Sequence, residues 1–223
     1  RMVRTTSRFG PSGAARRTSP VSTAFVCRIA SRSLPPPGRA TASTTLPQAC
    51  SPNTAPYSGV AGASHVRDKL VEMAHLNETI YGAGIASSHE SHATAAGNFE
   101  PDDLLANVCK HNVTRFPYEM ARLAQDLAGG VVATLPSEKD FDNPETGPLL
   151  RKYLKAREGV PAEARARITR LIENMTLGRN AVGYLTESMH GAGSPQAQRI
   201  QIARQMGLEE KKQLAKRLAG IPD

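Results

Sequence analysis

Residues 101–130 have the sequence PDDLLANVCKHNVTRFPYEMARLAQDLAGG, and this stretch decides the fold. Its apolar residues recur mostly at helical spacing. Pro101 suits the first position of a helix, and the two aspartates after it place negative charge at the positive end of the helix dipole. Pro117 should kink or interrupt the helix, and Gly129–Gly130 should end it. The stretch therefore predicts helical structure with a break near its middle.

The same spacing continues on both sides of this stretch. Ser194 followed by proline is a typical helix start, and Gly207 should break the last helical segment. The one apolar run that favours a strand is 131–135, after the two glycines. We therefore expect an all-α fold, most simply a helical bundle. The further helices expected from the pattern cover residues 66–92, 146–157, 161–189 and 195–219.

Residues 1–64 differ in composition from the rest of the chain. They are rich in Arg, Ser, Thr, Pro and Ala, contain eight of the 28 basic residues, and hold no Asp or Glu. Such a segment buries too little apolar surface to offset the entropy of ordering, so we expect a disordered tail before a folded domain at 65–223. The composition also fits a transit peptide, which would make the protein organellar, or an out-of-frame stretch joined to a genuine coding end.

Charge and cysteine content narrow the function classes. The formal charge is +8, but the 20 basic and 20 acidic residues after Ser64 cancel, so a nucleic-acid domain is not expected. The sequence contains no run of about 18 apolar residues, so no membrane helix is predicted, and a cytoplasmic location is expected. Cys27, Cys50 and Cys109 form no CxxC pair, which argues against a zinc site or a disulfide framework. His89 and His92 would share a helix face and suggest a metal, although a polar turn is the favoured interpretation.

Four segments after the tail are distinctive. They are Asn77–Gly84 (NETIYGAG), Leu104–Glu119 (LLANVCKHNVTRFPYE), Ala128–Phe141 (AGGVVATLPSEKDF) and Thr186–Arg199 (TESMHGAGSPQAQR). They resemble one enzyme family, and the resemblance runs from about His65 to the end. That family contains the 4-hydroxybutyryl-CoA dehydratases, which are also vinylacetyl-CoA delta-isomerases, and the flavin-dependent 4-hydroxyphenylacetate 3-hydroxylases. The resemblance implies the C-terminal helical bundle of the acyl-CoA dehydrogenase architecture, which builds a homo-tetramer.

The resemblance implies a site for FAD that is shared with preceding domains and with a neighbouring subunit. Gly129 and Gly130 would let their backbone approach the FAD pyrophosphate, although a simple helix stop explains them as well. Arg115 could balance the pyrophosphate charge, or it is a solvated or inter-helix arginine. His190 contacts flavin or caps helix carbonyls.

Glu187 is the residue to which the resemblance gives the catalytic proton transfer. It lies between Leu185 and Met189, and a carboxyl group in apolar surroundings has a raised pKa and can exchange protons near neutral pH. A surface glutamate is the alternative interpretation. Ala192 stands where the acyl-CoA dehydrogenases carry their glutamate, so the pattern follows the dehydratase branch.

The function implied by the resemblance is dehydration of 4-hydroxybutyryl-CoA, with an acyl-CoA substrate and FAD. The family's [4Fe–4S] cluster is held by three cysteines and one histidine of the preceding domains, and no residue here can be assigned to it. We therefore expect the chain to be inactive alone. The alternatives are the corresponding domain of a flavin-dependent 4-hydroxyphenylacetate 3-monooxygenase and a non-catalytic helical assembly module.

Overall fold

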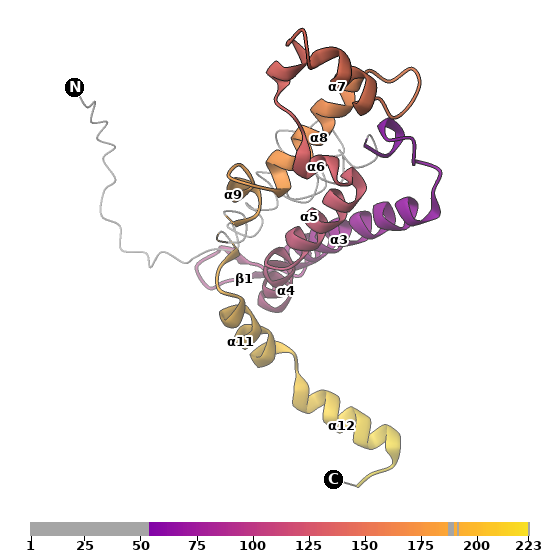
Figure 1. Cartoon of the computed structure of the whole chain (residues 1–223). Coiled ribbons are helices and arrows are strands. Elements are labelled where there is room, and N and C mark those ends of the chain that lie inside the picture. The colour runs from indigo at the N-terminus through magenta and orange to yellow at the C-terminus, as the bar shows by residue number, and fades with distance from the viewer. Residues whose placement is uncertain (1–53, 187–189, 191, 223) are drawn as a thin grey trace, which may run out of the picture.

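A computed structural model describes residues 54–186, 190 and 192–222. Within these ranges the fold is all-α apart from one small hairpin, as expected (Figure 1). None of the described helices is long and apolar enough to cross a membrane. The elements are α3 (Ser64–His89), β1 (His92–Ala93), β2 (Phe99–Glu100), α4 (Asp103–Val113), α5 (Phe116–Ala128), α6 (Val131–Thr134), the 3-10 helix η1 (Glu138–Phe141), α7 (Gly147–Leu154), α8 (Ala162–Thr176), α9 (Ala181–Tyr184), α11 (Pro195–Gln205) and α12 (Leu208–Ala219).

The helix starts follow the local capping signals. Asp102, rather than Pro101, begins α4, because its Oδ1 accepts a hydrogen bond of 2.7 Å from the backbone N–H of Leu105. The expected interruption at Pro117 is confirmed: α4 ends at Val113, and Pro117 lies in the first turn of α5, where its missing N–H costs no helical hydrogen bond. Local chemistry therefore divides the deciding stretch into two helices.

The expected strand at 131–135 is wrong. Residues Val131–Thr134 form the short helix α6, in which the N–H of Val132 donates to the carbonyl of Gly129 (3.1 Å). Val132 is the buried member of the run and packs against α8, while Ala133 and Thr134 are exposed. An apolar run this short does not distinguish a strand from a helical turn, and here one buried valine on a helical turn satisfies the core.

The prediction of one long helix from Pro161 to Met189 is also wrong, because the helix that begins there is shorter. Helix α8 ends at Thr176, because Leu177 is extended (φ −132°, ψ 157°) and Gly178 has a positive φ of 63°. The short helix α9 follows after this turn. Leu177, at the turn itself, packs against the main core and continues the apolar pattern past the end of α8, so the pattern alone did not mark the break.

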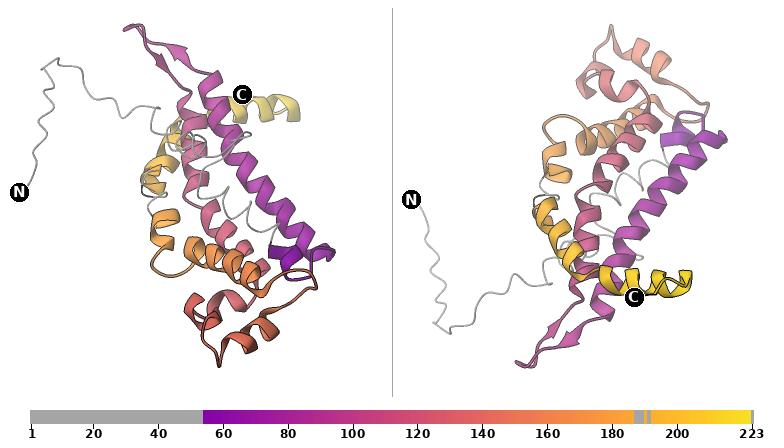
Figure 2. Two further views of the ribbon diagram at one scale, coloured as in Figure 1. Left: turned by 90° about the horizontal axis from the view of Figure 1, so that it is seen from above. Right: turned by 90° about the horizontal axis from the view of Figure 1, so that it is seen from below.

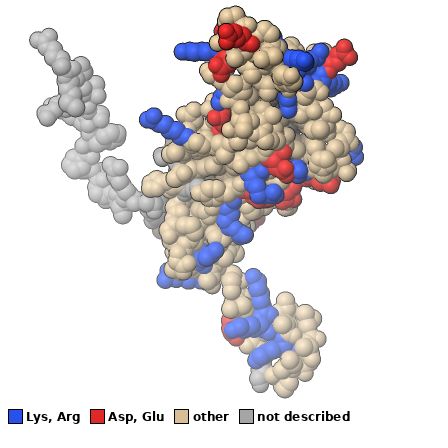
Figure 3. Space-filling model, in the orientation of Figure 1, with Lys and Arg blue, Asp and Glu red and all other residues tan. Residues whose placement is uncertain are grey.

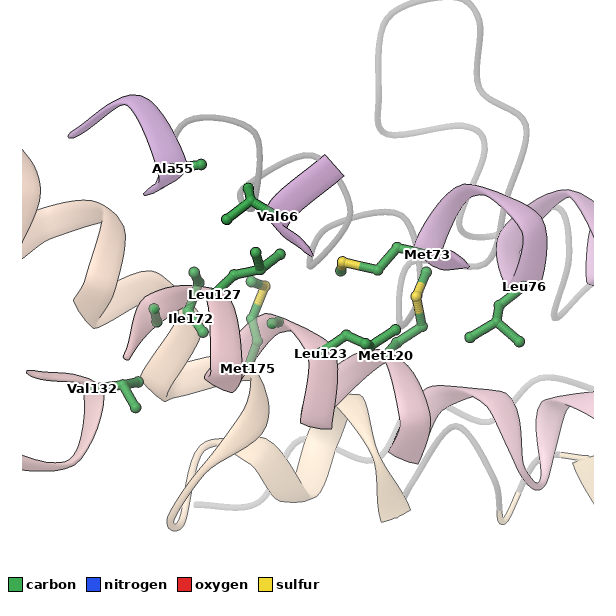
Figure 4. Close-up of a cluster of buried hydrophobic side chains, with 12 residues drawn as sticks. Ala55, Val66, Met73, Leu76, Met120, Leu123, Leu127, Val132, Ile172 and Met175 are labelled. Atoms are coloured by element: carbon green, nitrogen blue, oxygen red, sulfur yellow. The ribbon is translucent and has the colours of Figure 1, made fainter. Parts of the chain in front are cut away.

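The main core lies between α3, α5 and α8, where the buried side chains point toward one another (Figure 4). Two polar contacts fix how these helices align. Lys69 of α3 forms an ion pair of 2.6 Å with Asp126 of α5, and Gln125 donates a hydrogen bond of 2.9 Å to the carbonyl of Thr176. The largest fully buried side chains of this core are Met73, Met120, Ile172 and Met175.

The folded domain begins before residue 65. Thr54 and Ala55 are buried, and Ala55 belongs to the main core. The backbone N–H of Val60 donates to the carbonyl of Ala55 (3.0 Å), which folds this segment into a turn. Residues 54–63 were expected to be part of the tail, and they pack on the domain instead. The rest of that expected tail, 1–53, lies outside the described residues.

The β1–β2 hairpin projects from one end of the bundle, and α7 lies at the opposite end (Figure 2). The strands are antiparallel, with His92 opposite Glu100. His89 is the last residue of α3 and His92 belongs to β1, so the two histidines do not share a helix face. Among the described residues, no three His, Cys, Asp or Glu side chains gather as metal ligands.

Candidate functional site

Helices α4 and α11 are antiparallel, and this arrangement builds a corner of the bundle. At one end, Gln205 Nε2 of α11 donates to Asp103 Oδ2 of α4 (3.3 Å). At the other end, Ala192, just before α11, packs with Cys109 and Val113 of α4. The start of α11 therefore lies beside the end of α4. Phe116 packs against the same cluster, so the start of α5 meets them there.

A second apolar cluster forms the floor of this corner. Ile80 and Cys109 are fully buried in it, and the thiol Sγ of Cys109 donates to the carbonyl of Ile80 (3.4 Å). Cys109 is thus a buried thiol within this cluster. The floor fixes α3, α4 and the turn before α11 to one another.

Side-chain hydrogen bonds hold residues 192–194, just before α11, against the first turn of that helix. Ser194 begins α11 as predicted, and its hydroxyl accepts from the N–H of Ala197 (3.4 Å). Gln198, which is 3% exposed, donates from Nε2 to the carbonyls of Ala192 (2.8 Å) and Gly193 (3.3 Å). Its Oε1 is buried and has no partner among the residues that the structure describes.

Gln198 was not predicted to have a role. It lies in the TESMHGAGSPQAQR segment, one turn after the capping residue of α11, but the sequence of that segment does not show which side of α11 faces the core. Since a buried unpaired oxygen is costly, Oε1 is an acceptor available to an N–H or O–H donor from outside the described residues.

The residues predicted for the site fall in three places. Glu187 and its neighbour Met189 lie outside the described residues. His190 is described and exposed, and its carbonyl accepts a hydrogen bond from the N–H of Gly193 (3.1 Å). Arg115 is exposed at the N-cap position of α5 and forms no ion pair with a described carboxylate. Its neighbour Phe116 packs against the cluster that contains Ala192, so the start of α5 lies at the same corner as the start of α11.

Gly129–Gly130 lies at the opposite end of α5 from Arg115. A helix rises 1.5 Å per residue, so the 13 residues of α5 separate the two places by about 20 Å. The structure therefore does not bring Arg115 and the glycine pair together around one pyrophosphate within a single chain. The start of α5, with Arg115, lies at the corner formed with α11, and the glycine pair lies directly before α6.

The two glycines differ in what their backbone requires. Gly129 has φ 70° and ψ −173°, a conformation essentially restricted to glycine, and its N–H closes α5 on the carbonyl of Gln125 (2.9 Å). Gly130 has ordinary helical torsions (φ −57°, ψ −22°). A Cβ at either position would meet no described atom within 4 Å. Nothing in the described chain therefore requires glycine at Gly130.

A hollow between η1, α7 and α8 is the other candidate, and its chemistry argues against an anion site. Arg151 pairs with Glu163 (2.6 Å), Arg167 pairs with Glu138 (3.3 Å), and Arg170 pairs with Glu173. The pKa of Glu163 is lowered, first by hydrogen bonding to its own backbone N–H and then by Arg151. The mixture of acidic and basic side chains over this end of the bundle is visible in Figure 3. Its three arginines are neutralised by carboxylates.

The family model and the related proteins that match this chain agree on one family. Residues 50–220 match the family described as 4-hydroxyphenylacetate 3-hydroxylase C terminal. The 4-hydroxybutyryl-CoA dehydratase/vinylacetyl-CoA-Delta-isomerase of Clostridium aminobutyricum is 57% identical over 175 residues, which are 75% of this chain and 36% of that protein. The oxygenase component of 4-hydroxyphenylacetate 3-monooxygenase from Thermus thermophilus is 30% identical over 115 residues, 51% of this chain and 23% of that protein.

Solved structures agree with this assignment. An oxygen-tolerant archaeal 4-hydroxybutyryl-CoA dehydratase from N. maritimus is 59% identical, with a TM-score of 0.77, and the match covers 91% of this chain and 40% of that one. An oxygenase component of 4-hydroxyphenylacetate 3-monooxygenase, complexed with FAD and 4-hydroxyphenylacetate, shares the fold at 22% identity (TM-score 0.70; 78% of this chain, 36% of that one). This chain thus spans well under half the length of these relatives. It belongs to the 4-hydroxyphenylacetate 3-hydroxylase C-terminal family, within which it resembles the 4-hydroxybutyryl-CoA dehydratases.

Proposed function

We propose that this chain is the C-terminal helical part of an FAD-dependent dehydratase/isomerase that acts on 4-hydroxybutyryl-CoA or a closely similar acyl-CoA. The observation that carries the proposal is the 57% identity to a curated dehydratase, against 30% to a monooxygenase oxygenase component. The matched part is about a third of that relative, so we propose that this chain has no activity alone and acts as a homo-oligomer with the preceding domains.

Two features of the described chain fit a bound FAD. A Cβ at Gly130 would meet no described atom within 4 Å, and the helical torsions of Gly130 do not require glycine. A ligand can therefore approach the backbone closely at that point. At the other end of α5, the exposed Arg115 offers charge for a phosphate, and Gln198 Oε1 offers a buried acceptor. When bound, the flavin would supply electron transfer at the substrate carbon.

The separation of about 20 Å along α5 supports two partial flavin sites per chain. We propose that the corner with Arg115 and His190 serves one FAD, and that Gly129–Gly130 serves a second FAD held mainly by a neighbouring subunit. The homo-oligomer then follows from the site, because each flavin needs residues of two chains. Glu187 is proposed to transfer the substrate proton, and Gln198 positions the turn that follows it.

A chimera tests the proposal. The matched C-terminal part of the clostridial dehydratase is replaced by residues 50–220 of this chain, and conversion of 4-hydroxybutyryl-CoA to crotonyl-CoA is measured. Turnover with retained FAD supports the dehydratase branch. A chimera that folds and binds FAD without converting this substrate contradicts it, and hydroxylation of 4-hydroxyphenylacetate by the equivalent monooxygenase chimera would favour the other branch.

The role of Glu187 is tested in the same chimera. The substitution Glu187→Gln should leave folding and FAD content unchanged and lower turnover by about 10²–10⁴, the usual contribution of general acid–base catalysis. The matched control is Asp102→Asn, which keeps a helix-capping side chain but removes its negative charge from the start of α4, and it should leave turnover nearly unchanged. Full turnover in the Glu187→Gln chimera would remove Glu187 from the mechanism.

A further inference from the structure

Helix α8 packs against both helices that flank the Gly129–Gly130 pair, α5 and α6 (Figure 1). The two glycines are exposed, and a Cβ added at either of them would meet no described atom within 4 Å. An exposed turn without packed neighbours opens easily unless the residues on both sides of it are fixed. Val132, two residues after the pair, is fixed by its burial in the main core. Polar contacts to α8 fix the residues on both sides of the turn.

Gln125 joins the residues before the pair to the C-terminal end of α8. Its Nε2 donates a hydrogen bond of 2.9 Å to the carbonyl of Thr176, the last residue of α8. The last four carbonyls of a helix have no donor within that helix, so Gln125 satisfies one that α8 leaves open. The carbonyl of Gln125 accepts from the N–H of Gly129 (2.9 Å). One residue therefore connects the end of α8 to the first glycine.

Arg170 joins the residues after the pair to the middle of α8. Its Nη2 donates to the carbonyls of Leu135 (3.2 Å) and Pro136 (2.7 Å), directly after α6. Its Nη1 pairs with Glu173, one turn further along α8, and this contact orients the guanidinium. A guanidinium can hold a carboxylate and two carbonyls at once, because its five N–H groups are fixed in one plane.

The two contacts attach both ends of the segment 129–135 to the same helix. Arg170 and Thr176 are six residues apart, hence about 9 Å along α8. The segment is therefore held at both ends by one rigid element, while its two glycines stay exposed. Gln125 and Arg170 lie outside the four segments that carry the family resemblance, and no role was predicted for either of them.

We propose that Gln125 and Arg170 are positioning residues for flavin binding. By attaching the segment 129–135 to α8, they hold the exposed backbone of Gly129–Gly130 in one conformation before the flavin of the neighbouring subunit binds. A backbone that is fixed in advance loses less conformational entropy on binding, so the affinity for the ligand is higher. This inference rests on the proposed flavin role of the glycine pair. The two side chains act through the backbone and do not contact the flavin themselves.

Hydrogen exchange of the full chain tests whether these contacts hold the segment. Arg170→Met keeps an unbranched apolar side chain and removes all of its donors. The amides of Val132 and Ala133, which form the hydrogen bonds of α6, should then exchange about tenfold faster, because the segment opens more often. Gln125→Met should have the same effect from the other end. Unchanged exchange in both variants would overturn the proposal.

The matched control is a second arginine of α8 that makes the same kind of contact. Arg165 Nη1 donates to the carbonyl of Leu154 at the end of α7 (2.9 Å), outside the segment 129–135. Arg165→Met therefore removes an arginine–carbonyl contact from the same helix, and it should change neither the exchange of Val132 nor the binding of FAD. Urea unfolding of the full chain shows how far each substitution lowers the overall stability.

The dissociation constant for FAD is measured by titration of the dehydratase chimera after removal of its flavin. Arg170→Met and Gln125→Met should each raise this constant by about tenfold relative to Arg165→Met. Arg170→Lys keeps a cationic donor and should recover part of the affinity. With FAD in excess, turnover should return to the parent value, because the lost contacts act on binding and not on the chemical step.

The outcomes separate this inference from the proposed function. A merely structural role would lower stability in Arg165→Met and Arg170→Met alike and leave their FAD affinities equal, which would overturn the inference. Faster exchange with an unchanged dissociation constant would overturn it as well. A parent chimera that binds no FAD would overturn the proposed function and this inference together, whereas a parent and variants that bind FAD equally well would overturn this inference alone.

Discussion

Gly129 and Gly130 are adjacent, yet replacing each by alanine should have opposite effects on stability. Gly129→Ala forces a side chain into a conformation (φ 70°, ψ −173°) that costs about 1–3 kcal/mol. Gly130→Ala keeps helical torsions and meets no described atom within 4 Å, so the free energy of unfolding should stay the same or rise by up to about 1 kcal/mol through the less flexible unfolded chain.

The measurement is urea unfolding of the full chain followed by far-UV circular dichroism, with the midpoint and slope compared among the variants. Equal losses for the two substitutions would refute the reasoning, because they would show that the torsions do not distinguish the glycines. A loss above about 1 kcal/mol for Gly130→Ala would show that this position is packed.

The substitution at Gly130 also tests whether the glycine pair binds flavin in the dehydratase chimera. Gly130→Ala should lower FAD retention, because a methyl group enters the space left for the ligand. Gly82→Ala is the matched control, since Gly82 lies within α3 with equally open surroundings. If the two variants retain FAD equally, the glycine pair has no part in flavin binding, whatever its effect on stability.

Three further substitutions follow from the structure. Ile172→Ala should lower the stability by about 2–5 kcal/mol in urea unfolding, because this fully buried side chain lies in the main core; a loss below about 1 kcal/mol would contradict that packing. Gln198→Met removes two hydrogen bonds and one unpaired oxygen, so the net change should stay within about 1 kcal/mol, while hydrogen exchange in the turn before α11 speeds up. Glu163→Gln should lower the free energy of unfolding by about a few tenths of a kcal/mol at pH 7. The pKa of Glu163 is lowered in the folded chain, so its carboxylate stabilises the fold at pH values above the ordinary pKa of a glutamate. That contribution is lost as the pH falls through the lowered value, so the difference from the parent chain should vanish in acid, and a difference that persists in acid would contradict the prediction.

The sequence by itself determined the fold class and the helix starts with local signals. Ser194 and Pro195 mark the beginning of α11, Pro117 divides α4 from α5, and Gly207 separates α11 from α12. Each signal acts within one turn of helix, through a cap or a backbone torsion, so it can be recognised without knowledge of the surroundings. The resemblance carried by four segments gave the family for the same reason, since motifs are continuous in the chain.

Only the tertiary structure decided which of these segments meet. The end of α8 at Thr176 and the helical turn at Val131–Thr134 depend on which side faces the core, and short apolar runs do not specify this. The antiparallel packing of α11 on α4 brings Ala192 to Val113 and Phe116, and the length of α5 keeps the glycine pair about 20 Å from Arg115. Packing between residues far apart in the chain has no period in the sequence, so the separation of Arg115 from the glycine pair along α5 was visible only once the helices were placed.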